Sequence, residues 1–241
     1  MRVRIIGIGM GPHQLTPEAA AALRGCDYAV AARKRKDDGL FELRRAVCEA
    51  HGLELVAVPD PERDRDAPAD YRAAVADWHE ARVRAFEQVL AERGGSAAFL
   101  VWGDPSLYDS TLRIVDRIGE RGKVPVEYDV LPGVSAPQLL AARHRIVLHE
   151  VGRPVHFTPQ RRLAEAVAAG QDNIAVMLGA RPAFEELGEW TVWWGANLGT
   201  DTEELVAGRV ADVLPRIGTA RTRAKDRAGW VMDTALLRRP S

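Results

Sequence analysis

The chain has 241 residues, 46% of them hydrophobic and 28% charged, with a formal net charge of −1 at pH 7. This length suits one large α/β domain or two smaller ones, each with its own core. The charge balance lacks the positive field typical of nucleic-acid-binding or membrane-surface proteins, so we expect neither partner. No apolar run approaches the roughly 20 residues that span a bilayer.

The N-terminus and the cysteines favour a soluble cytoplasmic protein. A strand-forming stretch at residues 3–6 leaves no room for a signal peptide. The spacing of Cys26 and Cys48 fits neither a zinc knuckle nor a secreted disulfide framework. We therefore expect reduced, buried thiols and no metal site.

The first half of the chain alternates strands with helices. An apolar strand at residues 2–8 runs into the loop Gly7-Ile8-Gly9-Met10-Gly11-Pro12. Thr16, followed by Pro17 and Glu18, is a favourable N-cap for a helix that ends near Arg24. Further strands are predicted at residues 27–32, 54–58, 99–102 and 126–131, with helices at 40–50, 69–93 and 112–118. This order predicts a parallel sheet.

The pattern changes near Gly133, after which strands become more frequent. A helix is predicted at residues 137–143, and strands at 155–158, 173–178, 191–194 and 229–234, with 203–207 leading into 209–213. This half is expected to form a mixed sheet. We therefore predict two α/β domains, 1–133 and 134–241, packed closely with the active site in a cleft between them.

The first glycine loop resembles a dinucleotide-binding loop only in part. The fingerprint needs a glycine where this chain has Pro12. It also needs an acidic residue after the second strand, where Ala32-Arg33 stands. The sequence disfavours a nicotinamide enzyme, although a close approach of the backbone to another ligand stays plausible.

The stretch at residues 99–111 is the centre of the chain's chemistry. An apolar strand ends in Gly103-Asp104-Pro105, and Ser110 or Thr111 is placed to cap the helix after it. Open α/β sheets bind their ligands at such strand ends. Turn residues occur at these junctions in any case, so a cofactor loop and a structural turn are about equally favoured.

A run of charges follows the second strand, at Lys34-Arg35-Lys36-Asp37-Asp38. The plain interpretation is a solvated loop. Its place at the carboxyl end of a strand, beside the first glycine loop, adds weight to the alternative of a polar site, and both interpretations stay open.

Three loops form a pattern together: Gly7-Ile8-Gly9-Met10-Gly11 with Leu15-Thr16, Gly103-Asp104-Pro105, and Pro132-Gly133-Val134-Ser135. In order and spacing the set resembles the tetrapyrrole methylases, the S-adenosylmethionine-dependent methyltransferases of the corrin and sirohaem pathways. The likeness covers essentially the whole chain and implies the two-domain fold of that family. One departure is Pro12-His13, where many members carry an acidic Gly-Asp-Pro.

Further segments resemble the deacetylating members of this family, which serve aerobic cobalamin biosynthesis; they lie at residues 59–64, 77–82, 100–111, 140–145, 194–200 and 229–234. The resemblance implies methylation of precorrin-5 at ring carbon 1, with release of the extruded acetyl group as acetate. It also implies a homodimer and a small tetrapyrrole substrate.

The resemblance further implies that S-adenosylmethionine binds between the domains in a folded conformation. Its expected contacts are Met10, Trp102, Gly103, Asp104 and Leu107 from the first domain, Ser135 and Ala136 from the junction, and Leu178, Gly199 and Val231 from the second. Apolar Leu107 and Leu178 suit the two faces of an adenine ring.

The charged loops supply the hypothesis for catalysis. Acid/base groups are expected among Lys36, Asp37, Asp38 and Asp104. The peripheral carboxylates of the substrate are expected to contact Arg33, Arg35, Arg63 and Arg65, with Gly9 and Tyr108 as further substrate contacts. For each arginine the plain alternative is a surface charge.

Two other functions stay open at this point. One is a methyltransferase of the same fold that acts on another precorrin or on diphthamide. The other is a tetrapyrrole carrier without catalysis, which would have no reason to keep both the Gly-Asp-Pro and the Pro-Gly-Val-Ser loops.

Overall fold

The computed structural model describes residues 1–33, 38–61 and 71–240, and for 71–75 it describes the backbone alone. The chain divides into two compact units, Met1–Val134 and Ser135–Ser241. Each unit is an α/β sandwich built on its own sheet of five strands.

The first unit has a parallel sheet, as its strand–helix alternation predicted. The strands lie in the order β3-β2-β4-β1-β5, and each neighbouring pair is parallel. Their interiors are apolar because helices cover both faces of the sheet. The strands are β1 (Arg2–Gly7), β2 (Tyr28–Arg33), β3 (Leu55–Pro59), β4 (Ser96–Val101) and β5 (Glu127–Leu131).

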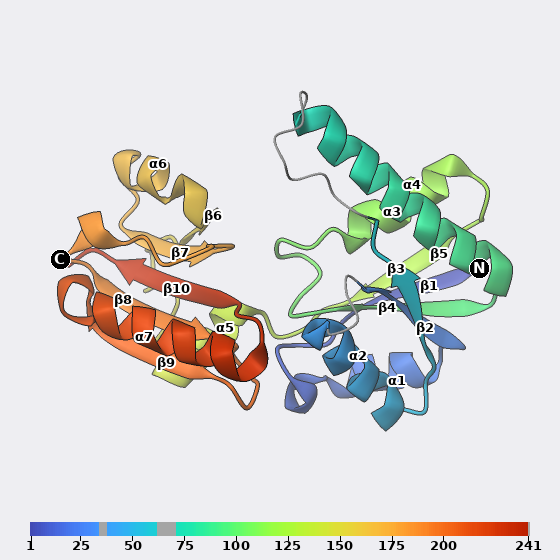
Figure 1. Ribbon diagram of the computed structural model, residues 1–241, viewed down its shortest axis with the longest axis horizontal. Coiled ribbons are helices and arrows are strands. Elements are labelled where there is room, and N and C mark those ends of the chain that lie inside the picture. The colour runs from blue at the N-terminus through green and yellow to red at the C-terminus, as the bar shows by residue number, and fades with distance from the viewer. Residues whose placement is uncertain (34–37, 62–70, 241) are drawn as a thin grey trace. The chain divides into compact units, whose positions relative to one another are not determined.

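Two helices pack on each face of this sheet (Figure 1). α1 (Pro17–Arg24) and α2 (Gly39–Ala50) share one core, and α3 (Tyr71–Arg93) and α4 (Thr111–Arg121) share the other. The loops after β1 and β2 therefore turn to one face and the loop after β4 turns to the opposite face. Diverging loops leave a crevice at the carboxyl edge of a parallel sheet, beside β4.

The starts of α1 and α4 test the N-caps that the sequence predicts. Thr16 caps α1 as predicted, with its Oγ1 accepting a hydrogen bond from the Ala19 N–H at 3.1 Å. The cap predicted for α4 is wrong: Ser110 has a helical backbone, and its side chain makes no capping bond. Asp109 takes that role, because its Oδ1 accepts from the Thr111 N–H at 2.6 Å.

The second unit has the mixed sheet that the sequence predicted, in the order β6-β7-β10-β8-β9. The β6–β7 pair is parallel and the other pairs are antiparallel. The strands are β6 (His156–Pro159), β7 (Asn173–Met177), β8 (Thr191–Ala196), β9 (Glu204–Arg209) and β10 (Asp233–Arg238).

The last strand begins later than predicted, at Asp233 rather than Gly229. Gly229 ends the long helix α7 (Val210–Ala228) in a left-handed conformation. The stretch predicted from residue 209 to residue 213 belongs to this helix from Val210 onward. Residues 210–228, for which the sequence predicts no helix, therefore form one.

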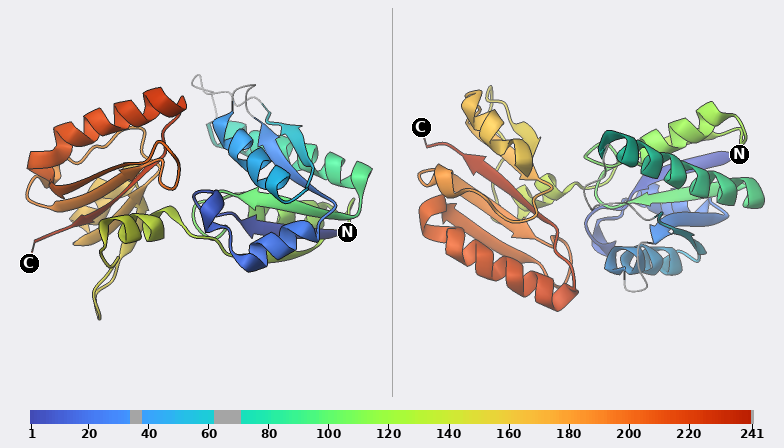
Figure 2. Two further views of the ribbon diagram at one scale, coloured as in Figure 1. Left: turned by 90° about the horizontal axis from the view of Figure 1, so that it is seen from below. Right: turned by 45° about the horizontal axis from the view of Figure 1, so that its top comes forward.

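The helices of the second unit pack on both faces of its sheet. α6 (Leu163–Ala168) and α7 share one core with the strands, around the fully buried Trp194 and Ile217. α5 (Ala136–His144) packs on the opposite face (Figure 2). Short 3-10 helices occur in both units, at Pro12–Gln14, Gln160–Arg162 and Glu185–Leu187. Among all the described helices, none combines the length and apolar character needed to cross a bilayer.

Candidate functional site

The loops after β1 and β4 are joined to each other. Gly9 and Gly103 form an isolated antiparallel bridge, in which the Gly103 N–H donates to the Gly9 carbonyl at 2.8 Å. The return bond, from the Gly9 N–H to the Gly103 carbonyl, measures 3.2 Å. Both residues have positive φ angles, 68° and 79°, which glycine adopts without steric cost. The bridge fixes the two loops that the sequence singled out.

The loop after β5 approaches the same place through backbone alone. A Cβ on Gly133 would overlap the Gly103 carbonyl oxygen and would lie 2.8 Å from the Gly7 carbonyl carbon. A Cβ on Gly7 would lie 2.9 Å from the Gly103 oxygen. The carboxyl ends of β1, β4 and β5 therefore meet at a distance that only glycine permits. We call these three residues the glycine junction.

Asp104 holds the glycine junction closed. Its Oδ2 accepts from the Gly133 N–H at 2.9 Å, and its Oδ1 accepts from the Ser106 N–H at 2.8 Å and from the Ser106 hydroxyl. Burial raises the pKa of Asp104, but these three bonds outweigh burial and leave the pKa below its ordinary value. The carboxylate is thus charged and joins the β4 loop to the β5 loop.

Trp102 carries an unused hydrogen-bond donor beside this junction. Its indole Nε1 is buried and has no hydrogen-bond partner among the described residues. A buried N–H without a partner costs free energy, so the atom suits an acceptor on a ligand. Nearby on the first loop, Met10 is buried and its N–H donates to Gln14 Oε1 at 2.9 Å. Leu107 is half-buried after Asp104, whose carbonyl accepts its N–H.

In the second unit, the residues expected to contact the cofactor lie on strand ends. Leu178 follows β7 in a left-handed conformation, with φ at 58° and 59% of its surface exposed. Its side chain is thus open to solvent at the end of the strand. Gly199 has φ at 80° and donates its N–H to Glu203 Oε2 at 2.7 Å. Val231 is half-buried against the core, just before β10.

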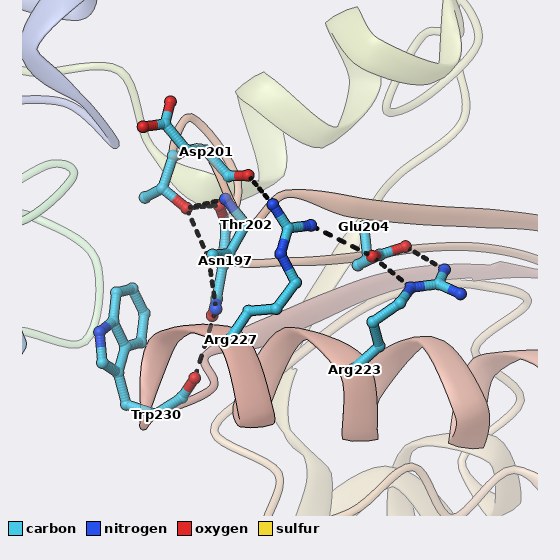
Figure 3. A network of polar contacts seen from close by, with 8 residues as sticks. Asn197, Asp201, Thr202, Glu204, Arg223, Arg227 and Trp230 are labelled. Atoms are coloured by element: carbon cyan, nitrogen blue, oxygen red, sulfur yellow. Dashed lines mark hydrogen bonds and ion pairs between the residues drawn. The ribbon is translucent and has the colours of Figure 1, made fainter.

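A polar network shapes the turn that carries Gly199 (Figure 3). The buried Asn197 donates from Nδ2 to Thr202 Oγ1 at 3.0 Å and to the Trp230 carbonyl at 3.3 Å. Its Oδ1 accepts from the Met232 N–H at 2.9 Å. Arg227 donates to the Asp201 carbonyl at 2.8 Å. One asparagine thus ties the turn after β8 to the segment that contains Val231.

The start of α5 carries the two residues predicted at the domain junction. Ser135 is buried at the N-cap, and its N–H and hydroxyl both donate to Gln138 Oε1 at 2.9 Å. Ala136 is the first residue of the helix. Free N–H groups at a helix start are donors for polar ligand atoms.

The charged residues predicted for catalysis and substrate binding are described in part. Asp38 caps α2, its Oδ1 accepting from the Phe41 N–H at 3.2 Å, and Arg33 lies over the Phe41 ring. Tyr108 has φ at 53° and is 44% exposed. The remaining predicted residues lie outside the described part of the chain; they are Arg35, Lys36, Asp37, Arg63 and Arg65.

The structure also brings out residues that the sequence did not single out. Asn197 was noted within a motif without a role, and its network depends on partners up to 35 residues away. Asp233 accepts from Arg221 Nε at 3.0 Å and from Trp194 Nε1 at 3.3 Å. Burial raises the pKa of Asp233, against the lowering effect of Arg221. No local pattern marks either residue, because each depends on packing between elements distant in the chain.

Comparisons with known proteins agree with this geometry. The family model of the Tetrapyrrole (Corrin/Porphyrin) Methylases matches residues 2–214. A curated relative from Sinorhizobium sp, "Precorrin-6A synthase [deacetylating]", is 40% identical over 99% of this chain and 95% of its own length.

Solved structures give the same result. A cobalamin synthesis related protein (CobF) from Corynebacterium diphtheriae superposes with a TM-score of 0.86 at 34% identity, covering all of both chains. The cobalt precorrin-4 methyltransferase CbiF superposes with a TM-score of 0.63 over 99% of this chain and 94% of its own. At 16% identity, the second match shows the fold alone.

The glycine junction predicts a strong effect of one methyl group. Gly133→Ala should lower the free energy of unfolding by about 1–3 kcal/mol, because its Cβ overlaps the Gly103 carbonyl. The measurement is urea unfolding followed by circular dichroism. Gly218→Ala is the control: nothing lies within 4 Å of its added Cβ, so stability should be unchanged or slightly higher. Equal stability of the two variants would contradict the junction.

Asp104 predicts a pH dependence. Its lowered pKa means that its contribution to stability is fully present above its ordinary value of 3.8 and is lost as the pH falls below it. Asp104→Asn should cost about 1–3 kcal/mol at neutral pH. The gap from wild type should stay nearly constant down to about pH 4 and shrink in unfolding curves recorded at lower pH. Asp201→Asn, which changes an exposed carboxylate, should follow wild type throughout.

Proposed function

We propose that this chain, which belongs to the tetrapyrrole (corrin/porphyrin) methylases, methylates precorrin-5 at ring carbon 1 and releases acetate, giving precorrin-6A. The chain is therefore an S-adenosylmethionine-dependent C-methyltransferase of cobalamin biosynthesis. The observation that carries this function is the 40% identity with a precorrin-6A synthase over 99% of the chain. The close approach at the glycine junction, together with the hydrogen bond from the Gly133 N–H to Asp104, explains why the loops typical of the family need glycine and aspartate at these positions.

The residues present fit S-adenosylmethionine. Trp102 offers a buried N–H that no described residue accepts, and Leu178 offers an exposed apolar surface. We propose these as contacts in their respective units, together with Met10, Gly103, Leu107, Ser135, Ala136, Gly199 and Val231. When bound, the cofactor supplies an activated methyl group on a sulfonium.

The chain's own contribution is orientation and electrostatics. Methyl transfer is an in-line displacement, so holding the acceptor carbon in line and excluding water accounts for much of the acceleration. The ring carbon is nucleophilic through the conjugated pyrroles and needs no protein nucleophile. Release of acetate requires addition of water to the acetyl carbonyl before the carbon–carbon bond breaks, and a base assists that step.

The geometry revises the role of one proposed acid/base residue. Both oxygens of Asp104 accept hydrogen bonds from the protein, and its pKa is low. We propose Asp104 as a positioning residue that sets the loops around the cofactor. Lys36, Asp37 and Asp38 stay the proposed acid/base groups, and Arg33, Arg35, Arg63 and Arg65 the proposed carboxylate contacts, with Gly9 and Tyr108 beside the substrate.

We also propose a cytoplasmic homodimer. The unpaired thiols of Cys26 and Cys48 are buried, which suits a reducing compartment. The dimer is carried over from the family resemblance, and light scattering of the purified protein tests it.

The reaction gives a direct test of the function. Purified protein incubated with precorrin-5 and S-adenosylmethionine should form S-adenosylhomocysteine and acetate in equal amounts. Mass spectrometry and an enzymatic acetate assay measure the two products. Methylation without acetate would instead indicate another methyltransferase of this fold. Binding of the tetrapyrrole with no turnover would indicate a carrier.

Trp102 gives a sharper test of the cofactor contact. Trp102→Phe removes the unused N–H and keeps an aromatic ring, so folding stability should stay the same or rise. Affinity for S-adenosylhomocysteine should fall about five- to tenfold in calorimetric titration, the cost of one hydrogen bond. Trp193→Phe, on the half-buried face of β8, is the control and should bind as wild type does. If the Trp102 variant bound S-adenosylhomocysteine as tightly as wild type, the proposed contact between Trp102 and the cofactor would be wrong.

A further inference from the structure

A cavity of about 230 Å³ lies in the first unit, at the carboxyl ends of β2 and β4. The two strands send their chains to opposite faces of the sheet, so the starts of α2 and α4 line its sides. Two arginines reach it, Arg44 from α2 and Arg82 from α3. Neither was among the arginines proposed above as substrate contacts.

Arg44 is held by two backbone carbonyls of the described chain. Its Nε donates to the Leu100 carbonyl at 2.9 Å and its Nη1 to the Leu40 carbonyl at 3.0 Å. Its Nη2 makes no hydrogen bond or ion pair to any described residue. Burial lowers the pKa of Arg44, so its charge is poorly hydrated. A poorly hydrated guanidinium with a free donor favours an anionic partner.

Arg82 is fixed by its neighbours in a similar way. Its Nε lies 2.8 Å from Asp60 Oδ1, and both side chains are largely buried, 15% and 7% exposed. Its guanidinium stacks over the Trp78 ring at 4.8 Å. These contacts leave the terminal nitrogens without a hydrogen bond to any described residue. The arginine is thus held in place ahead of binding, which reduces the entropy lost when a ligand arrives.

Two carboxylates also line the cavity, but each already accepts a hydrogen bond from a backbone N–H at the start of a helix. Asp109 Oδ1 accepts from the Thr111 N–H, and Asp38 Oδ1 accepts from the Phe41 N–H. They balance the arginine charges in part, while the positive ends of α2 and α4 add to the potential. The free hydrogen-bonding capacity of the arginines is all donor, in the planar arrangement that suits a carboxylate.

We propose that this cavity binds one carboxylate group, between Arg44 and Arg82. The inference rests on the proposed function, which supplies two sources of that group: a side-chain carboxylate of the tetrapyrrole and the released acetate. A volume of 230 Å³ admits a group of this size but excludes the macrocycle. In the first case the cavity fixes the orientation of the ring, and in the second it holds the product.

Titration calorimetry with two probes tests the proposal and separates the sources. The probes are sodium acetate and uroporphyrin III, a tetrapyrrole with eight side-chain carboxylates. Arg44→Gln removes the fork, and Ala32→Leu narrows the cavity while both arginines remain. Arg113→Gln, which changes an exposed arginine on α4 outside the cavity, is the matched control.

The expected result is a loss of affinity of about tenfold or more in both cavity variants, with none in the control. Loss for uroporphyrin III identifies a side-chain carboxylate, and loss for acetate identifies the free product. Variants that bind both probes as wild type does, or a wild-type protein that binds neither at millimolar concentration, would overturn the proposal.

A parallel titration with S-adenosylhomocysteine keeps the two proposals apart. Both cavity variants should bind it as wild type does, because neither change touches the glycine junction. If wild type fails to bind S-adenosylhomocysteine while carboxylate binding still depends on Arg44, the methyltransferase function fails and the cavity assignment stands. If wild type binds S-adenosylhomocysteine but carboxylate binding does not depend on Arg44, the proposed methyltransferase function stands and the cavity assignment fails.

Discussion

The carboxyl ends of β1, β4 and β5 meet with no side chain between them, and the chemistry of the first unit depends on this approach. Gly7, Gly103 and Gly133 come so close that a methyl group on Gly7 or Gly133 would collide with backbone. Asp104 then joins the β4 loop to the Gly133 N–H. The loops after β1, β4 and β5 are thus joined to one another. Beside this arrangement stands the Trp102 indole N–H, which has no hydrogen-bond partner among the described residues and which we propose as a cofactor contact.

The same topology produces the second feature of the unit. Because β2 leads to α2 on one face and β4 leads to α4 on the other, the sheet edge opens between them. Side chains line this opening, and two of them are arginines: Arg44 is held by backbone carbonyls, and Arg82 by a carboxylate and an indole ring. The glycine junction and the cavity lined by Arg44 and Arg82 therefore lie on neighbouring strands of one edge. The proposed reaction needs both a held cofactor and a held polyanionic acceptor.

Much of this arrangement could be predicted from the sequence, because local signals agree with the fold. The parallel sheet follows from the βαβ order, and the Thr16 cap follows from residues adjacent in the chain. The helix α7 was missed because Pro215 and Gly218 have low helix propensity, although the helix runs through both. Its buried residues keep helical spacing at Val210, Val213, Ile217, Ala220 and Ala224. Asp104 was singled out for catalysis; its partner Gly133 is 29 residues away, and only the folded chain shows the bond.

The hydrogen bonds at this edge favour a positioning role for Asp104 over proton abstraction. Asp38, Asp104 and Asp109 each accept a hydrogen bond from a backbone N–H. For Asp104, its hydrogen bonds lower the pKa and keep the carboxylate charged. Carboxylates used in this way shape loops and helix starts. Donors without a hydrogen bond to any described residue also stand at this edge, on Trp102, Arg44 and Arg82. A conjugated ring carbon that attacks a sulfonium methyl needs little help from a base. The proposed contacts of these donors with a cofactor and a carboxylate match the demands of that step.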